Sequence, residues 1–83
     1  MTYTGVDKKT ALENLNARIQ EDLSKAGLED FYIRVEDVGA KAGIPDYASA
    51  RSFPKDATPD QCARAEGIAN RHVRDFRKQR YGG

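Results

Sequence analysis

Apolar residues recur at intervals of three and four in two stretches, one near each end of the chain. The first stretch carries them at Leu12, Leu15, Ile19 and Leu23, and the second at Cys62, Ala65, Ile68, Ala69, Val73 and Phe76. This interval is the period of one face of a helix. The sequence therefore predicts two amphipathic helices, near residues 8–26 and 59–80, whose apolar faces pack together.

Residues that favour helix ends bracket both stretches. Asp7 and Thr10 are alternative N-caps for the first helix, so its start is open by one turn. Gly27 is expected to end this helix in the left-handed conformation. Before the second helix, Thr58 and Gln61 have the spacing of a capping box, in which each side chain bonds the backbone of the other.

The segment between the two helices fits two secondary structures. Phe31, Ile33 and Val35 alternate with polar residues, which is the period of a half-buried strand. In that interpretation the other strand former is the N-terminal segment Thr2-Tyr3-Thr4, and at most a small two-stranded ribbon forms. In the alternative, residues 35–42 and 46–53 are two short helices that are joined by a turn at Gly43.

The fold that we predict is mainly α: a small three- to four-helix domain with at most one short two-stranded ribbon. A chain of 83 residues permits one domain with a modest core. We expect the core to form around apolar residues of the middle segment, namely Phe31, Val35, Val38, Ile44 and Phe53. Residues 1–83 then form a single domain, with flexible ends at residues 1–6 and 81–83.

Charge is distributed unevenly, although the formal net charge is only +1. Residues 1–30 carry a net charge of −2, residues 31–54 are balanced, and residues 55–83 carry +3. The basic end of the chain is therefore the candidate for binding an anionic surface. The residues that we assign to this binding are Arg51, Arg64, Arg71, Arg74, Arg77, Lys78, Arg80 and Tyr81. Cations near a helix C-terminus also suit the helix dipole, so part of this charge has a structural explanation.

Residues 33–53 contain Asp37-Val38, then Ala42-Gly43-Ile44, and then a run of small residues that carries Arg51. This arrangement resembles the helix-turn-helix of lactose-repressor-type regulators, over about a quarter of the chain. It departs from that family at Gly39, where a small alanine is usual, and at Ser49, where an apolar residue is usual. The resemblance implies a recognition helix in the major groove of DNA, with Pro45, Asp46, Tyr47, Ser49 and Arg51 on or near it.

Catalytic and metal chemistry find little support in the sequence. Cys62 and His72 are the candidates for a nucleophile and a base, but ten residues of helix separate them by about 15 Å. A single cysteine makes neither an internal disulfide nor a metal-binding pair. We therefore expect a protein that is not an enzyme and that holds no cofactor and no metal. No apolar run approaches the length of a membrane span, so we expect no membrane partner and a cytoplasmic location.

Two binding functions agree with these features. One is a small DNA-associated regulator that uses the helix-turn-helix-like segment and holds phosphates with its basic last helix. The other is a protein–protein interaction module, an adaptor or inhibitor that docks its Arg-rich helix and Tyr81 on an acidic partner. The C-terminal Gly82-Gly83 is similar to the tail of ubiquitin-type modifiers, but those modifiers have a strand-rich fold, so we interpret it as a helix stop.

Overall fold

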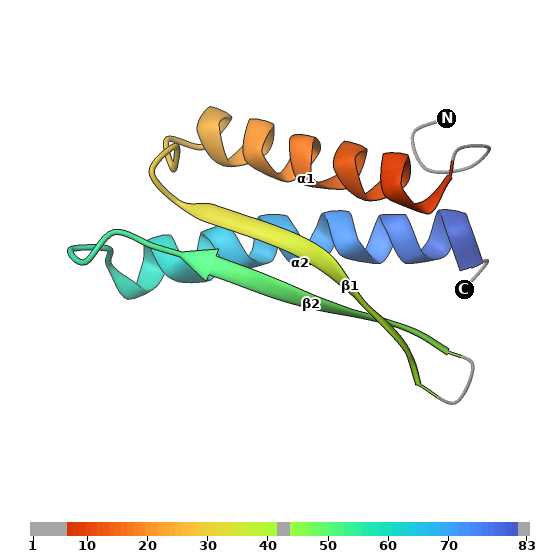
Figure 1. Cartoon of the computed structure of the whole chain (residues 1–83). Coiled ribbons are helices and arrows are strands. Elements are labelled where there is room, and N and C mark those ends of the chain that lie inside the picture. Colours follow the sequence, from red (N-terminus) through yellow and green to blue (C-terminus); the bar gives the residue numbers. More distant parts are fainter. Residues whose placement is uncertain (1–6, 42–43, 82–83) are drawn as a thin grey trace.

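The computed structural model describes the backbone of residues 7–41 and 44–81, and the side chains of residues 7–39 and 47–79. In chain order the elements are helix α1 (Lys8–Lys25), strand β1 (Tyr32–Lys41), strand β2 (Ile44–Ser52) and helix α2 (Pro59–Tyr81). Figure 1 shows α1 and α2 side by side and running in opposite directions, with the ribbon of β1 and β2 lying across them. The described part of the chain is thus a helix pair with a ribbon on one side.

The prediction of a mainly α domain with three to four helices is wrong. The two long helices are present, within about one residue of the predicted bounds. The short helices that we expected over residues 35–42 and 46–53 are instead the antiparallel strands β1 and β2. The expected turn at Gly43 and the expected strand at residues 2–4 lie outside the described residues.

The alternation of apolar and polar residues explains why residues 32–41 form a strand and not a helix. Ile33 and Val35 are buried against the helices, whereas Tyr32 and Arg34 beside them are exposed on the outer side of the ribbon. A strand places successive side chains on opposite faces, so this sequence buries one apolar row completely. A helix over the same residues would divide that row between two faces, and part of its apolar area would remain in water.

Hydrogen bonds at the helix ends fix the path of the chain into and out of the helices. Asp7 is the N-cap of α1, and its Oδ1 accepts a bond of 2.7 Å from the backbone N–H of Thr10. Gly27 ends α1 with φ at 77°, in the left-handed region. At the start of α2, the N–H of Gln61 donates to Thr58 Oγ1 at 3.1 Å, and the N–H of Thr58 donates to Gln61 Oε1 at 2.9 Å. The predicted capping box is therefore confirmed.

The core lies between the two helices and the inner face of β1. Its buried residues are Ala11, Leu15, Ile19, Leu23, Leu28, Phe31, Ile33, Val35, Ala65, Ile68, Ala69 and Phe76. Phe31 and Val35 are thus in the core as predicted, and Phe53 packs on Phe31 with ring centroids 5.2 Å apart. The prediction for Val38 is wrong, because its side chain is 56% exposed. The side chain of Ile44 lies outside the described residues.

Val38 is exposed because it is the extra residue of a β-bulge. The register of the ribbon shifts between Asp37 and Gly39, whose φ is 105°. Asp37 organises the bulge: its Oδ1 accepts from the N–H of Gly39 at 2.9 Å, and its Oδ2 lies 2.7 Å from Lys8 Nζ on α1. Beyond the bulge, the hairpin end of the ribbon turns away from the helix pair (Figure 1).

Two side-chain amides of α1 close the outer edge of β1. Asn16 donates to the carbonyl of Val35 at 3.0 Å and accepts from the N–H of Val35 at 2.7 Å. Gln20 donates to the carbonyl of Phe31 at 3.0 Å, and the N–H of Ile33 lies 3.5 Å from its Oε1. The two amides therefore occupy the positions that a third strand would take, and this edge is no longer a template for pairing.

Candidate nucleic-acid interface

Helix α2 buries one side and exposes a row of cations on the other. The buried side chains are Ala65, Ile68, Ala69 and Phe76. Four exposed cations, which we call the basic strip, are Arg64, Arg71, Arg74 and Lys78. Intervals of seven, three and four residues keep them on one side of the helix. At the helical rise the basic strip is about 21 Å long.

Among the side chains that the structure describes, no carboxylate pairs with the cations of the basic strip. In residues 7–39 and 47–79, whose side chains are described, no Asp or Glu oxygen lies within 4.0 Å of any of them. The cations elsewhere that do have such partners are Lys8, Lys25, Arg34 and Arg51. Small exposed residues lie between the strip residues, and a Cβ added at Gly67 would meet nothing within 4 Å. The basic strip is therefore open to a ligand.

Two of the predicted binding residues contact other parts of the protein instead. Arg51 lies on β2, and its Nη1 is 3.4 Å from Glu66 Oε1 on α2. The guanidinium carbon of Arg77 lies 5.8 Å from the ring centroid of Tyr47, within the range of a cation–π contact. Both contacts hold β2 against α2. We therefore assign these residues first to the fold and only second to binding.

The residues of the predicted recognition helix lie on a strand. Tyr47 and Ser49 belong to β2, and Asp46 pairs with Gly39 across the ribbon. The prediction of a helix here is wrong, because residues 44–52 complete the ribbon with β1. Tyr47 serves the core, where its ring meets that of Phe76 edge to face with centroids 5.5 Å apart. The side chains of Pro45, Asp46, Arg80 and Tyr81 lie outside the described residues.

A side-chain pair that joins the two helices, which we call the Asp22–His72 tie, was not predicted from the sequence. His72 Nε2 on α2 lies 2.6 Å from Asp22 Oδ2 on α1, and the two side chains are 15% and 35% exposed. The hydrogen bond from His72 holds the pKa of the Asp22 carboxyl below its usual value, and the nearby charges of Lys25 and Arg71 add to the effect. Of the basic strip, Arg71 is therefore near enough to Asp22 to act on its charge.

Acidification should weaken the Asp22–His72 tie. Because the pKa of Asp22 is lower in the folded state than in the unfolded state, its contribution to the free energy of unfolding is complete above the ordinary aspartate value of 3.8. The contribution disappears as the pH falls through the lower, folded value. We expect wild type to lose more stability than Asp22→Asn below about pH 4 in urea titrations. Asp75→Asn, which alters an exposed carboxylate on α2, should retain the wild-type acid response.

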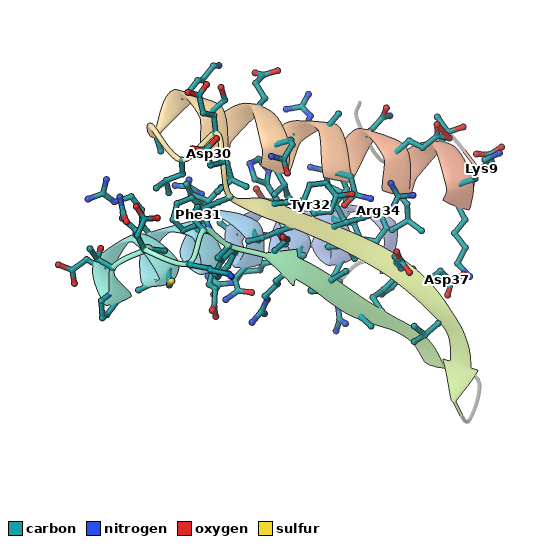
Figure 2. The ribbon with its side chains drawn as sticks, turned by 60° about the vertical axis from the view of Figure 1, so that its left-hand side comes forward. Lys9, Asp30, Phe31, Tyr32, Arg34 and Asp37 are labelled. Carbon is teal, nitrogen blue, oxygen red and sulfur yellow. The ribbon has the colours of Figure 1, made fainter. Side chains whose placement is uncertain are left out.

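A groove of about 430 Å³ runs between α1 and β1. Its lining residues are Lys9, Leu12, Glu13, Asn16, Arg34, Val35, Glu36 and Asp37. Figure 2 shows Arg34 and Asp37 along β1 and Lys9 at the start of α1. Charges of both signs alternate here, and Arg34 Nε already lies 3.6 Å from Glu36 Oε1. The groove is therefore expected to bind an anionic ligand more weakly than the basic strip does.

Comparison of the chain with protein-family models, with curated proteins and with solved structures finds no match. These comparisons do not test the resemblance to lactose-repressor-type regulators, although the helices that it implies are absent from residues 33–41 and 44–52. Within the described residues, no three His, Cys, Asp or Glu side chains are grouped to hold a metal ion. Neither helix, as far as it is described, has the length and apolar character to cross a membrane.

Proposed function

We propose that this protein is a non-enzymatic binding protein that associates with duplex DNA through the basic strip of α2. One observation carries the proposal: four exposed cations follow one side of a helix for about 21 Å, and no carboxylate in the described part of the chain lies within 4.0 Å of them. That length corresponds to about six phosphates of one DNA strand. Each phosphate that a Lys or Arg neutralises releases condensed counterions, and this release favours binding.

The surroundings of the basic strip favour phosphates over a protein partner. Protein interfaces depend on a few large anchors, mostly aromatic residues or Arg, that enter desolvated pockets. Between Arg64 and Lys78, the exposed residues of α2 besides the strip cations are Gly67, Asn70, Asp75 and Arg77, and Arg77 already contacts Tyr47. Short side chains allow a phosphate backbone to approach the helix, and guanidinium groups bind phosphates in a bidentate manner. An acidic protein docking on the same strip is the alternative function.

The proposed contacts do not read the DNA sequence. Phosphate contacts fix the position of a protein on a duplex but carry no sequence information. The strand β2 is packed on α2 through Arg51 and Tyr47, so it does not supply a recognition helix. We therefore propose binding that varies little between duplexes of different sequence and falls steeply with added salt.

A charge at the centre of the basic strip provides the sharpest test. Gly67 is exposed within α2 and has free space where a side chain would start, so Gly67→Glu and Gly67→Gln should both fold. The two variants differ in one negative charge. We expect Gly67→Glu to bind duplex DNA about three- to tenfold more weakly than Gly67→Gln at moderate salt, because the carboxylate repels the phosphates. Fluorescence anisotropy with a labelled duplex measures the difference.

A salt series completes this test. Replacing Arg71, Arg74 and Lys78 together by alanine should reduce the slope of log affinity against log salt by about three. Equal binding by Gly67→Glu and Gly67→Gln would show that α2 is not the contact surface. If wild type does not bind any duplex even at low salt, DNA is not the partner, and the acidic protein becomes the function to test.

A further inference from the structure

The two edges of the ribbon are treated differently by the fold. The edge of β1 is closed by the amides of Asn16 and Gln20. The β2 edge faces away from β1, and β2 meets α2 through the side chains of Tyr47 and Arg51. Because two helix side chains close the edge of β1 and the edge of β2 is open, any additional strand is expected to pair with β2.

The register of the ribbon shows which peptide groups lie on the open edge. In an antiparallel ladder, hydrogen-bonded and non-hydrogen-bonded pairs alternate. Val35 directs its N–H and carbonyl to Asn16, so its pair with Ser49 is a non-hydrogen-bonded one. The peptide groups of Ser49 and, two residues on, Arg51 therefore point away from β1. They accept and donate no hydrogen bond within the described part of the chain.

The open stretch of β2 lacks the features that normally prevent edge pairing. Such features are a proline, a bulge or a row of charges. Pro45 of β2 lies before this stretch, residues 47–52 contain no proline, and the bulge of the ribbon is on β1 at Val38. Arg51 is the one charged residue of this stretch, and Glu66 already lies beside it. The edge is thus compatible with a strand of similar composition.

We propose that β2 pairs with β2 of a second copy of this chain, in an antiparallel register centred on Ser49. The pairing gives one continuous four-stranded sheet with a two-fold axis between the two Ser49 residues. It is independent of the proposed DNA binding.

We infer that the strand that pairs with the open edge is β2 of a second copy, because β2 is complementary to itself in this register. In this register Ala48 lies opposite Ala50 of the second copy, so the crossing point is free of large side chains. Arg51 lies opposite Tyr47 of the second copy, so no two like charges face each other. A register centred on Arg51 would instead oppose two guanidinium groups, which is unfavourable. The charge pattern therefore excludes the register centred on Arg51 and is compatible with the one centred on Ser49.

The open peptide group of Ser49 gives the first test. Ser49→Pro removes an N–H that plays no part in the ladder with β1, whereas Ser49→Ala keeps it. By sedimentation equilibrium over a range of concentrations, wild type and Ser49→Ala should dimerise, and Ser49→Pro should dimerise about tenfold more weakly or not at all. Circular dichroism checks that the variants fold. A monomeric wild type, or equal dimerisation of the two variants, would overturn the proposal.

Cross-linking gives a second test that holds even if Ser49→Pro does not fold. In a Cys62→Ala background, Ser49→Cys places two thiols across the two-fold axis, where Cα atoms about 5.5 Å apart suit a disulfide. Mild oxidation should convert this variant to a covalent dimer. Arg34→Cys, an exposed position on the outer face of β1, should cross-link far more slowly. Similar rates for the two positions would refute the register.

Discussion

Phe76→Ala is expected to lower the free energy of unfolding by about 3–5 kcal/mol. The Phe76 side chain is 1% exposed, and its ring meets that of Tyr47 edge to face. Truncation removes its buried area and its ring contact, and it leaves a cavity between α2 and the ribbon. A domain of this size has a total stability of about 4–12 kcal/mol, so this loss is a large fraction of it. Urea denaturation followed by circular dichroism measures the change.

Val38→Ala is the control for this prediction. Val38 is also apolar, but its side chain is 56% exposed at the β-bulge. Its truncation should change the free energy of unfolding by no more than about 0.5 kcal/mol. If Phe76→Ala cost as little as Val38→Ala, α2 would not be packed on β2 as described.

Asn16→Ala is expected to lower the free energy of unfolding by about 2 kcal/mol. The change removes two hydrogen bonds at once, one to the carbonyl and one from the N–H of Val35. Both backbone groups are partly shielded, and each polar group left without a partner costs about 1–3 kcal/mol if water does not replace the lost bond. The edge of β1 also becomes available for pairing, so the variant should aggregate more readily on heating.

Asn70→Ala is a matched control for Asn16→Ala. It replaces the same residue type in the other helix, where the side chain is exposed and makes no hydrogen bond to any described residue. Both variants gain the same intrinsic helix propensity, about 0.5 kcal/mol. The difference between their free energies of unfolding therefore measures what the Asn16 hydrogen bonds to β1 contribute. Urea denaturation of both variants gives this difference. Equal changes in the free energy of unfolding of the two variants would mean that the Asn16 hydrogen bonds do not stabilise the fold.

The two helices could be predicted because their signals are local. Apolar spacing, the cap at Thr58 and the stop at Gly27 all lie within a few residues of the structure that they specify. The exposed cations of the basic strip follow from the same period, since a helix that buries Phe76 must expose Arg74.

The ribbon was only half visible in the sequence, because its second strand carries a weak pattern. β1 has the apolar row that includes Ile33 and Val35, but β2 alternates Tyr47, Ser49 and Arg51 with small residues. Its stability comes from pairing with β1, and pairing depends on residues distant in the sequence. The resemblance to a helix-turn-helix was built on this weak stretch, and for that reason it suggested helices.

The roles of several polar residues depend on tertiary contacts and could not be read locally. Arg51 was assigned to binding, but it faces Glu66 across two elements. His72 was considered only as a candidate base, and only the fold reveals Asp22 beside it. Asn16 and Gln20 did leave one signal, namely two amides four residues apart beside the apolar face of α1. That spacing matches a strand edge, on which every second residue faces the helix.

The hydrogen bond from the N–H of Val35 to Asn16 also makes the exchange of this N–H with solvent depend on the packing of α1 against the ribbon. A backbone N–H in the middle of a sheet is normally shielded by a neighbouring strand, and its exchange with solvent hydrogen reports the opening of that strand pair. The N–H of Val35 is shielded by a side chain of α1 instead. Its exchange therefore reports the detachment of α1 from the ribbon, while the N–H groups that β1 shares with β2 report the separation of the two strands.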